Sequence, residues 1–270
     1  MHPPARTTAR TAERTPENCP VLPPHIRAVV LDIDSVITDL FHVRAAAWTC
    51  VLDAYVEAFA PGAGLRGPEP ETELPRFLDG TRLVGALVSF LEARGLEAGS
   101  FGEAAEAARV LAIRQQDMLQ RYLHHYGVGI RRGTGELLEG LRRRGVACAA
   151  VSGTAGARGL LASRGLLPLI DVVLDGDDQG HRRVTVRPDP ALPLRAVRLL
   201  GAGPQETAVV DGSPYGVEAA ARGGFGRIVG LTPAGDAHRM AEMFHRGADV
   251  VAHDLGDLGA APRAAMAATA

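Results

Sequence analysis

Two aspartates, Asp32 and Asp34, follow an apolar, β-branched segment and are separated by a single residue. The apolar run over residues 27–33 is typical of a buried β-strand. Because alternate side chains of a strand share a face, both carboxylates are expected to leave its carboxyl end in the same direction. Two adjacent carboxylates repel each other unless a cation lies between them or one is protonated. The pair therefore predicts a Mg²⁺ site in which one carboxylate can act as a nucleophile.

Three further polar side chains stand beside predicted strands and helices. Ser152 directly follows an apolar strand segment and begins a loop with Gly153, where a hydroxyl and backbone N–H groups are suited to hold a phosphate. Arg187 lies just ahead of a predicted helix and is able to neutralise a phosphoryl group. Asp211 ends another strand segment and could bind a metal from the side opposite the first two acids. Because open α/β sheets bind ligands at the carboxyl ends of their strands, these side chains are expected around one crevice.

The segments that must position these groups alternate between strands and helices after a long helical block at residues 42–125. This alternation predicts right-handed βαβ units, a mostly parallel sheet and an α/β fold. The helical block is then an insertion after the first strand rather than a sequential domain. The predicted strands are 27–33, 146–151, 171–174, 207–210, 227–231 and 249–252, and the predicted helices are 45–59, 83–93, 102–124, 137–144, 155–164, 192–200 and 217–222.

The same pattern divides the chain into a core, a cap and two tails. Residues 25–41 and 126–258 are assigned to the core, and residues 42–125 to the helical cap domain. Residues 1–24 are rich in Pro, Thr and Arg and lack the apolar stretch of a signal peptide, so they are predicted to be a disordered tail. Residues 259–270 are predicted to be a C-terminal tail.

Composition narrows the function classes. With 270 residues and 46% hydrophobic side chains, the chain can bury one full core and a smaller satellite domain. Its net charge of −2 does not indicate a nucleic-acid binder, and no apolar run approaches membrane-spanning length. The three cysteines, Cys19, Cys50 and Cys148, form no metal or disulfide pattern, which favours a reduced, cytoplasmic protein. The candidate site residues, rather than the composition, suggest a small phosphorylated metabolite as the partner, and the expected state is a monomer or a weak homodimer.

The order of an acid pair, a hydroxyl, a cation and an acid resembles the four motifs of the haloacid dehalogenase (HAD) superfamily. The first motif of that superfamily reads D-x-D-x-[TV], matched here by Asp32, Asp34 and Val36. The resemblance is closest to the β-phosphoglucomutase-like branch and extends over residues 26–257. It includes residues 187–190, which read R-P-D-P where the family reads K-P-D-P. It implies a Rossmann-like parallel sheet core with an inserted α-helical cap.

The resemblance also implies a role for each candidate residue. Asp32 would be the nucleophile that forms an aspartyl-phosphate, and Asp34 would be the general acid and base. Mg²⁺ would bind at Asp32, at the carbonyl of Asp34 and at Asp211. Ser152 and Arg187 would hold the phosphoryl oxygens, while the cap would exclude water and select the substrate.

Several positions depart from the pattern of this family. The residue after the second aspartate is normally glycine, and here it is Ser35. In motif four the main metal-ligand position is Gly212, while Asp211 stands one residue early. Arg44 lies in the hinge region where relatives carry other residues, and Arg82 lies in a cap segment that reads approximately K-P-R-Y in the family. These two arginines are candidate substrate contacts of the cap and hinge.

The expected function is a Mg²⁺-dependent phosphatase that acts on a small phosphorylated sugar or sugar-like metabolite. Hydrolysis is favoured over mutase chemistry because the cap residues that would hold a phosphosugar for reorientation are missing. Two alternatives stay open. One is a β-phosphoglucomutase-type phosphosugar isomerase, and the other is a catalytically inactive HAD-fold binding protein, which the altered motif four would explain.

Overall fold

A six-stranded parallel sheet forms the centre of the computed structural model, which describes residues 21–62, 64–68, 73–74, 77, 83–97, 99–153, 156–176 and 188–259. The strand order is β3-β2-β1-β4-β5-β6, so the first strand lies inside the sheet. The predicted α/β class with a parallel sheet is confirmed, and each predicted strand is present. The strands are β1 (Ala28–Asp32), β2 (Ala147–Val151), β3 (Val172–Leu174), β4 (Thr207–Asp211), β5 (Arg227–Leu231) and β6 (Val250–Ala252).

Strand β1 is buried along its whole length, as expected of a parallel strand covered on both faces. The register with β2 sets Asp32 opposite Val151, so the next residue, Ser152, follows directly at the same edge. On the other side, the paired residues of β1 and β4 end one position before Asp32 and Asp211. The register therefore brings three of the predicted polar residues to one end of three neighbouring strands.

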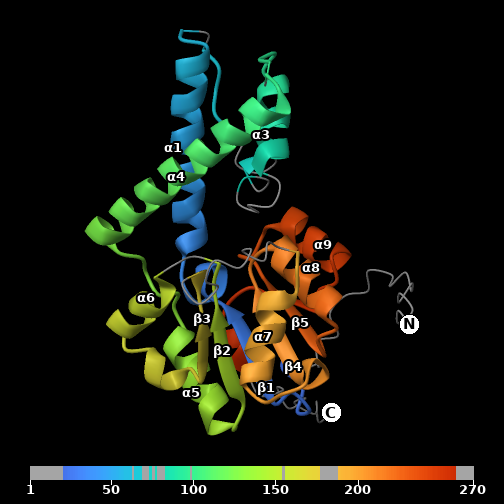
Figure 1. Cartoon of the computed structure of the whole chain (residues 1–270). Helices are drawn as coiled ribbons and strands as arrows, with labels where there is room; N and C mark the ends of the chain where they lie inside the picture. Colours follow the sequence, from blue (N-terminus) through green and yellow to red (C-terminus); the bar gives the residue numbers. More distant parts are fainter. Residues whose placement is uncertain are drawn as a thin grey trace, which may run out of the picture.

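Helices cover both faces of the sheet and bury a separate apolar cluster on each (Figure 1). Val29 and Leu31 of β1 belong to the cluster that contains residues of α5, α6 and α10, whereas Val30 belongs to the cluster with residues of α7, α8 and α9. This alternation is the period of two that a β-strand imposes. The helices are α5 (Thr134–Arg143), α6 (Ala157–Ser163), α7 (Ala191–Leu199), α8 (Pro214–Gly223), α9 (Ala237–His245) and α10 (Gly256–Gly259).

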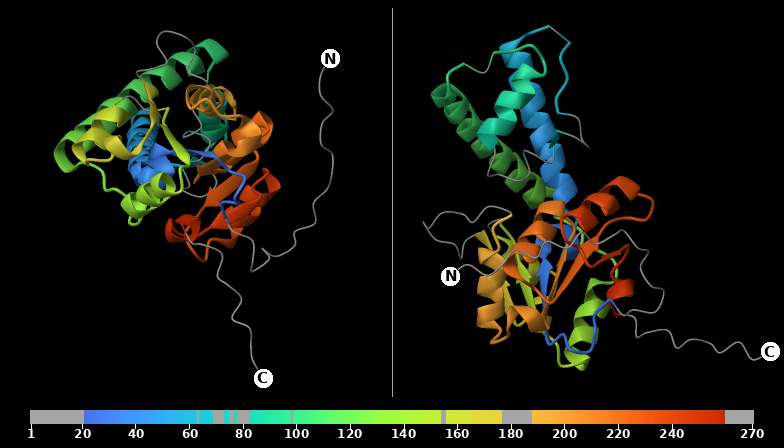
Figure 2. Two further views of the ribbon diagram at one scale, coloured as in Figure 1. Left: turned by 90° about the horizontal axis from the view of Figure 1, so that it is seen from below. Right: turned by 90° about the vertical axis from the view of Figure 1, so that its right-hand side faces the viewer.

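In the described part of the segment between β1 and α5, helices stand above one end of the sheet, as Figures 1 and 2 show from different sides. They are α1 (Leu40–Phe59), α3 (Leu83–Glu92) and α4 (Phe101–Tyr126), and they confirm the predicted insertion of a helical cap. The cap has its own apolar cluster, in which Phe77 lies 5.9 Å from Trp48 and 5.6 Å from Phe90 between ring centroids. Over the residues that the structure describes, no helix is long and apolar enough to cross a membrane.

The two chain segments that join the cap to the sheet lie side by side. Thr38 forms an isolated antiparallel bridge with Ile130, and the backbone N–H of Arg131 donates to the carbonyl of Ile37 at 2.8 Å. The two segments that connect the cap to the sheet are therefore hydrogen-bonded to each other, so they are not independent linkers.

The predicted inner boundary of the N-terminal tail is wrong by a few residues. Leu22 is only 4% exposed and belongs to the apolar cluster on one face of the sheet. Arg227 Nε donates to the Val21 carbonyl at 3.0 Å, which ties this segment to the start of β5. The single apolar pair of residues 21–22 was too short to indicate a buried segment, because burial here depends on tertiary contacts. Residues 1–20 and 260–270 lie outside the described residues.

Candidate active site

Four of the predicted site residues meet at the carboxyl ends of β1, β2 and β4, at the end of the sheet that faces the cap (Figure 1). Asp32 is 2% exposed, Asp34 6%, Ser152 1% and Asp211 5%. Polar side chains are rarely this buried unless they are hydrogen-bonded, and three of them are ionisable acids. Gly153 follows Ser152 and is exposed. Arg82 and Arg187 lie outside the described residues, so their placement stays a prediction.

The two aspartates reach the site in a different way from the one predicted. Strand β1 ends at Asp32, and residues Ile33–Ile37 form a π-helical turn, so Asp34 is not part of the strand. Thr38 closes this turn through its backbone N–H and its hydroxyl, which both donate to the Ile33 carbonyl, at 2.9 and 2.8 Å. The prediction from strand alternation was therefore wrong in its reason. An apolar run does not reveal where a strand gives way to a tight turn.

Asp34 accepts hydrogen bonds on both carboxylate oxygens. The Ser152 hydroxyl donates to Oδ1 at 2.7 Å, and the Arg44 guanidinium donates to Oδ2 at 3.2 Å. Arg44 lies near the start of α1, so this ion pair joins the cap to the core. The structure thus places the hinge candidate Arg44 at the acid pair and Ser152 on Asp34, while the role of Ser152 in holding phosphate stays a prediction.

Asp32 is oriented by the residue after Asp34. Its Oδ2 atom accepts a hydrogen bond from the Ser35 backbone N–H at 2.8 Å and another from the Ser35 hydroxyl at 2.6 Å. Ser35 is itself only 6% exposed. Ser35, which stands where the family pattern has glycine, is therefore in direct contact with the predicted nucleophile.

Asp211 lies over the first turn of α8. Its Oδ1 atom accepts from the Ser213 backbone N–H at 2.8 Å and lies 3.5 Å from the Ser35 hydroxyl oxygen. A Cβ atom on Gly216 would overlap the Asp211 carboxylate, at 2.0 Å from Oδ2, so any other residue there would displace this carboxylate. The carboxylate thus turns from the end of β4 toward the same centre as Asp32.

Arg239 of helix α9 completes the site, and the sequence did not indicate it. Its guanidinium donates to the Gly212 carbonyl at 2.6 Å. Burial lowers the pKa of Arg239, and the nearby acids Asp236 and Asp211 oppose that shift. Helix α9 was absent from the predicted helices, although Asp236 at its N-cap, which accepts from the Arg239 backbone N–H at 2.9 Å, is a usable signal.

The donor chemistry of the site fits Mg²⁺. Asp32 and Asp211 offer carboxylate oxygens, which are the ligands that Mg²⁺ prefers, and this ion is usually held by one or two carboxylates together with water and substrate phosphate. Within the described part of the chain, no group of three or more His, Cys, Asp or Glu side chains is arranged to hold a metal. Gly212 contributes no side-chain ligand for the ion. The carboxylates that could hold it are Asp32 and, in place of an acid at residue 212, Asp211.

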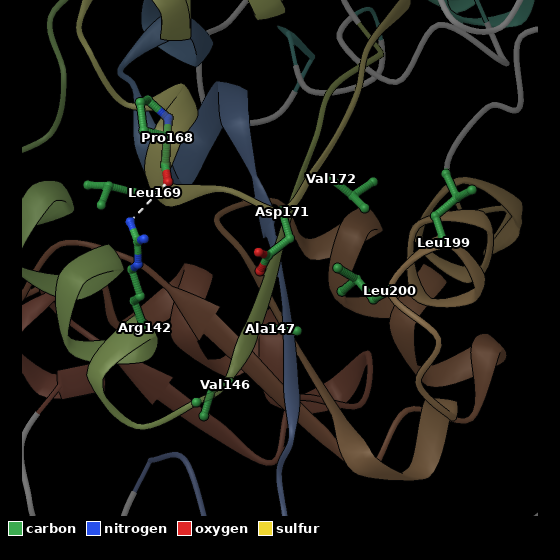
Figure 3. Close-up of a pocket in the computed structure, with 10 residues that line it drawn as sticks. Arg142, Val146, Ala147, Pro168, Leu169, Asp171, Val172, Leu199 and Leu200 are labelled. Carbon is green, nitrogen blue, oxygen red and sulfur yellow. Dashed lines mark hydrogen bonds between the residues drawn. The ribbon is translucent and has the colours of Figure 1, made fainter.

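A groove of about 520 Å³ lies at the other end of the sheet and is separate from this site (Figure 3). Val146 and Ala147 stand at the start of β2, and Leu199 and Leu200 at the end of α7. The Asp171 carboxylate in this groove accepts from the Cys148 backbone N–H at 2.8 Å, which is a structural contact. The groove lies at the amino ends of the strands, where ligands of parallel sheets are not expected.

Comparisons with known proteins agree with this geometry. The family model of the haloacid dehalogenase-like hydrolases matches residues 26–224. Over 243 residues the chain is 33% identical to a β-phosphoglucomutase of Mycobacterium bovis, which covers 88% of this chain and 93% of the relative.

Solved structures show the same likeness. A hydrolase from Pseudomonas syringae is similar with a TM-score of 0.63 and 24% identity, over 86% of this chain and 95% of that one. A HAD family hydrolase from Deinococcus radiodurans, solved with bound phosphate and sodium, is similar with a TM-score of 0.60 and 25% identity, over 87% and 94% of the two chains. The likeness extends over most of the chain rather than over one motif.

Proposed function

The chain belongs to the haloacid dehalogenase-like hydrolase family, and from this premise we propose that it is a Mg²⁺-dependent phosphatase of a small phosphorylated sugar or sugar-like metabolite. The observation that carries the proposal is the convergence of three buried acids on one end of the sheet beneath the cap: Asp32 at the end of β1, Asp34 in the turn that follows and Asp211 at the end of β4. A catalytic site explains this costly burial of acids better than a structural role does.

The proposed reaction has two steps. Asp32 attacks the phosphorus atom and forms an aspartyl-phosphate, while the bond to the leaving oxygen breaks and Asp34 gives that oxygen a proton. Asp34 then takes a proton from a water molecule, which attacks the aspartyl-phosphate, releases inorganic phosphate and restores Asp32. The two hydrogen bonds from Ser35 to Asp32 Oδ2 hold the nucleophile in one rotamer for the attack.

Arg44 is suited to link substrate entry to the state of Asp34. Its guanidinium forms an ion pair with Asp34 Oδ2, and its side chain is 28% exposed, so a substrate phosphate can compete for it. Transfer of Arg44 to the phosphate would release Oδ2 from that pair and allow Asp34 to exchange a proton. When bound at Asp32 and Asp211, Mg²⁺ would offset the charge on the phosphoryl oxygens.

A mutase is the second candidate, and one observation favours it. The Mycobacterium bovis relative, 33% identical and aligned over 93% of its length, is called a β-phosphoglucomutase. In that reaction Asp32 would return its phosphoryl group to another hydroxyl of a sugar rather than to water. The product would be an isomer, and turnover would require a sugar bisphosphate as activator.

The test measures phosphate release and isomer formation over a panel of sugar phosphates, with Mg²⁺ and with EDTA. For the phosphatase, we expect Mg²⁺-dependent release of phosphate that is lost in Asp32→Asn and kept in Asp117→Asn, a matched change of an exposed acid on α4. An isomer formed only with a bisphosphate present would support the mutase instead. Absence of both products with every substrate would contradict both reactions and leave a binding protein as the explanation.

A further inference from the structure

The Ser35 side chain fills the space that a side chain at residue 212 would need. An ideal Cβ atom on Gly212 would lie 2.8 Å from the Ser35 Cβ, 2.9 Å from its hydroxyl oxygen and 3.1 Å from its carbonyl oxygen. Cβ atoms are essentially never found under 3.0 Å from other heavy atoms of this kind. Both groups are buried, and a close-packed interior cannot absorb such an overlap without shifting the backbone. A side chain at residue 212 and the serine at residue 35 therefore exclude each other.

The Ser35 hydroxyl uses this space to join the predicted nucleophile to the turn after β4. It accepts a hydrogen bond from the Gly212 backbone N–H at 2.9 Å and lies 2.6 Å from Asp32 Oδ2. The Asp211 Oδ1 atom is farther away, at 3.5 Å. A hydroxyl carries a single proton, and the shorter contact takes it, so Ser35 donates to Asp32.

The backbone of Gly212 is also hydrogen-bonded through its carbonyl group. Its carbonyl accepts from Arg239 of α9, and its N–H donates to Ser35, so the turn that carries Asp211 is fixed by two side chains from distant elements. The Ser35 carbonyl in turn accepts from Arg131, at 3.1 Å, in the segment that joins the cap to α5. Serine at residue 35 is thus connected to the nucleophile, to the turn after β4 and to the hinge.

We propose that Ser35 is a positioning residue for Asp32. We also propose that Ser35 and Gly212 form a unit that limits the cation site to two carboxylates. The serine hydroxyl orients Asp32 from the space that a residue-212 side chain would otherwise fill. The cation site would then be formed by Asp32 and Asp211, because residue 212 has no side chain. The statement about the cation rests on the proposed function, whereas the packing of the two residues does not.

The packing is tested by a thermodynamic cycle on the full chain. Gly212→Ala should lower the Tm by about 4 °C or more, because its methyl group meets Ser35. In the Ser35→Gly background, the same Gly212→Ala change should cost much less, because the two contacts under 3.0 Å are gone and only the 3.1 Å approach to the carbonyl oxygen of residue 35 remains. Equal losses of Tm in the two backgrounds would overturn the proposal, and this measurement requires no activity.

The cation site is tested by calorimetric titration with Mg²⁺ alone. The double variant Ser35→Gly with Gly212→Asp offers a third carboxylate, and it should bind Mg²⁺ about tenfold more tightly than the natural chain. Gly212→Asp alone should lose Tm instead of gaining affinity. The variant Ser35→Gly with Gly212→Ala is the matched control without the new charge, and equal affinity in both double variants would overturn the cation part.

The positioning role is tested by kinetics. Ser35→Ala keeps the Cβ atom but removes the hydroxyl, so kcat should fall about tenfold or more while KM changes little. An unchanged kcat in an otherwise active enzyme would overturn this role. If no phosphoryl transfer is detected at all, but the thermal cycle shows the coupling, the proposed function fails while the Ser35–Gly212 unit stands.

Discussion

Asp34 is held from two parts of the chain, by Ser152 in the core and by Arg44 in the cap. The sequence predicted that Ser152 and the acids would converge, because each follows an apolar strand in a pattern of parallel strands. It did not indicate the partner of each acid, since a hydrogen bond between residues 118 positions apart depends on packing that no local pattern encodes. Arg239 was missed for the same reason.

Among single residues, Arg44→Met is expected to lower kcat/KM by about tenfold to a hundredfold. A hydrogen bond to a charged group contributes about 1.5–3 kcal/mol, and this interaction would be lost. Methionine keeps most of the side-chain length but cannot pair with Asp34 or bind phosphate. Steady-state kinetics with the best substrate of the panel would measure the change. Arg109→Met is the control, because Arg109 is an exposed α4 residue whose ion pair lies on the surface. Equal kinetics in the two variants would contradict a role for Arg44.

Among the elements, the π-helical turn Ile33–Ile37 has the most influence on the site, because it carries Asp34 and Ser35 away from β1. All six strands were predicted from apolar runs, which are strong signals in a buried parallel sheet. The end of β1, the turn and helix α9 were not. The turn is held by a hydrogen bond from the Thr38 side chain to the backbone, and helix α9 buries only Met243. Neither element therefore has a long apolar pattern in the sequence.

Thr38→Val is therefore expected to destabilise the fold by about 1 kcal/mol and to lower activity, because its hydroxyl is the side-chain donor to the Ile33 carbonyl. Valine has nearly the same shape, so packing is preserved. Urea unfolding and phosphate release would measure the two effects. Thr49→Val removes a comparable bond within α1, to the Ala45 carbonyl, and should change both quantities less. A stable, fully active Thr38→Val protein would contradict this importance of the turn.

Across the whole molecule, the apolar cluster of the cap is separate from the two clusters that line the sheet. The family resemblance predicted from the motifs, with its inserted cap, is confirmed by the family match and by the fold. That much was accessible because several short motifs in a fixed order are specific to one topology. The attachment of the cap through Thr38 and Ile130 was not accessible, since one isolated bridge has no sequence pattern.

Two buried leucines test whether the cap and the sheet lose stability separately. Leu87→Ala in α3 should cost about 2–5 kcal/mol and raise hydrogen exchange mainly in α1, α3 and α4. Leu138→Ala in α5, equally buried, is the reciprocal variant and should raise exchange mainly in the sheet. Exchange mass spectrometry of the two variants would show the pattern. A uniform rise over the whole chain in both would mean that cap and sheet unfold as one unit.

The overlap between Ser35 and a side chain at residue 212 also constrains the order in which mutations can accumulate in this family. A lineage that carried glycine after the second aspartate and an acid at residue 212 could not gain the serine first without strain. The accessible route passes through an intermediate with glycine at both positions. Reversal requires the same two steps in the opposite order. The two departures from the family pattern are therefore coupled, and in a mutational scan that changes one position at a time the reversal at residue 212 would be scored as harmful.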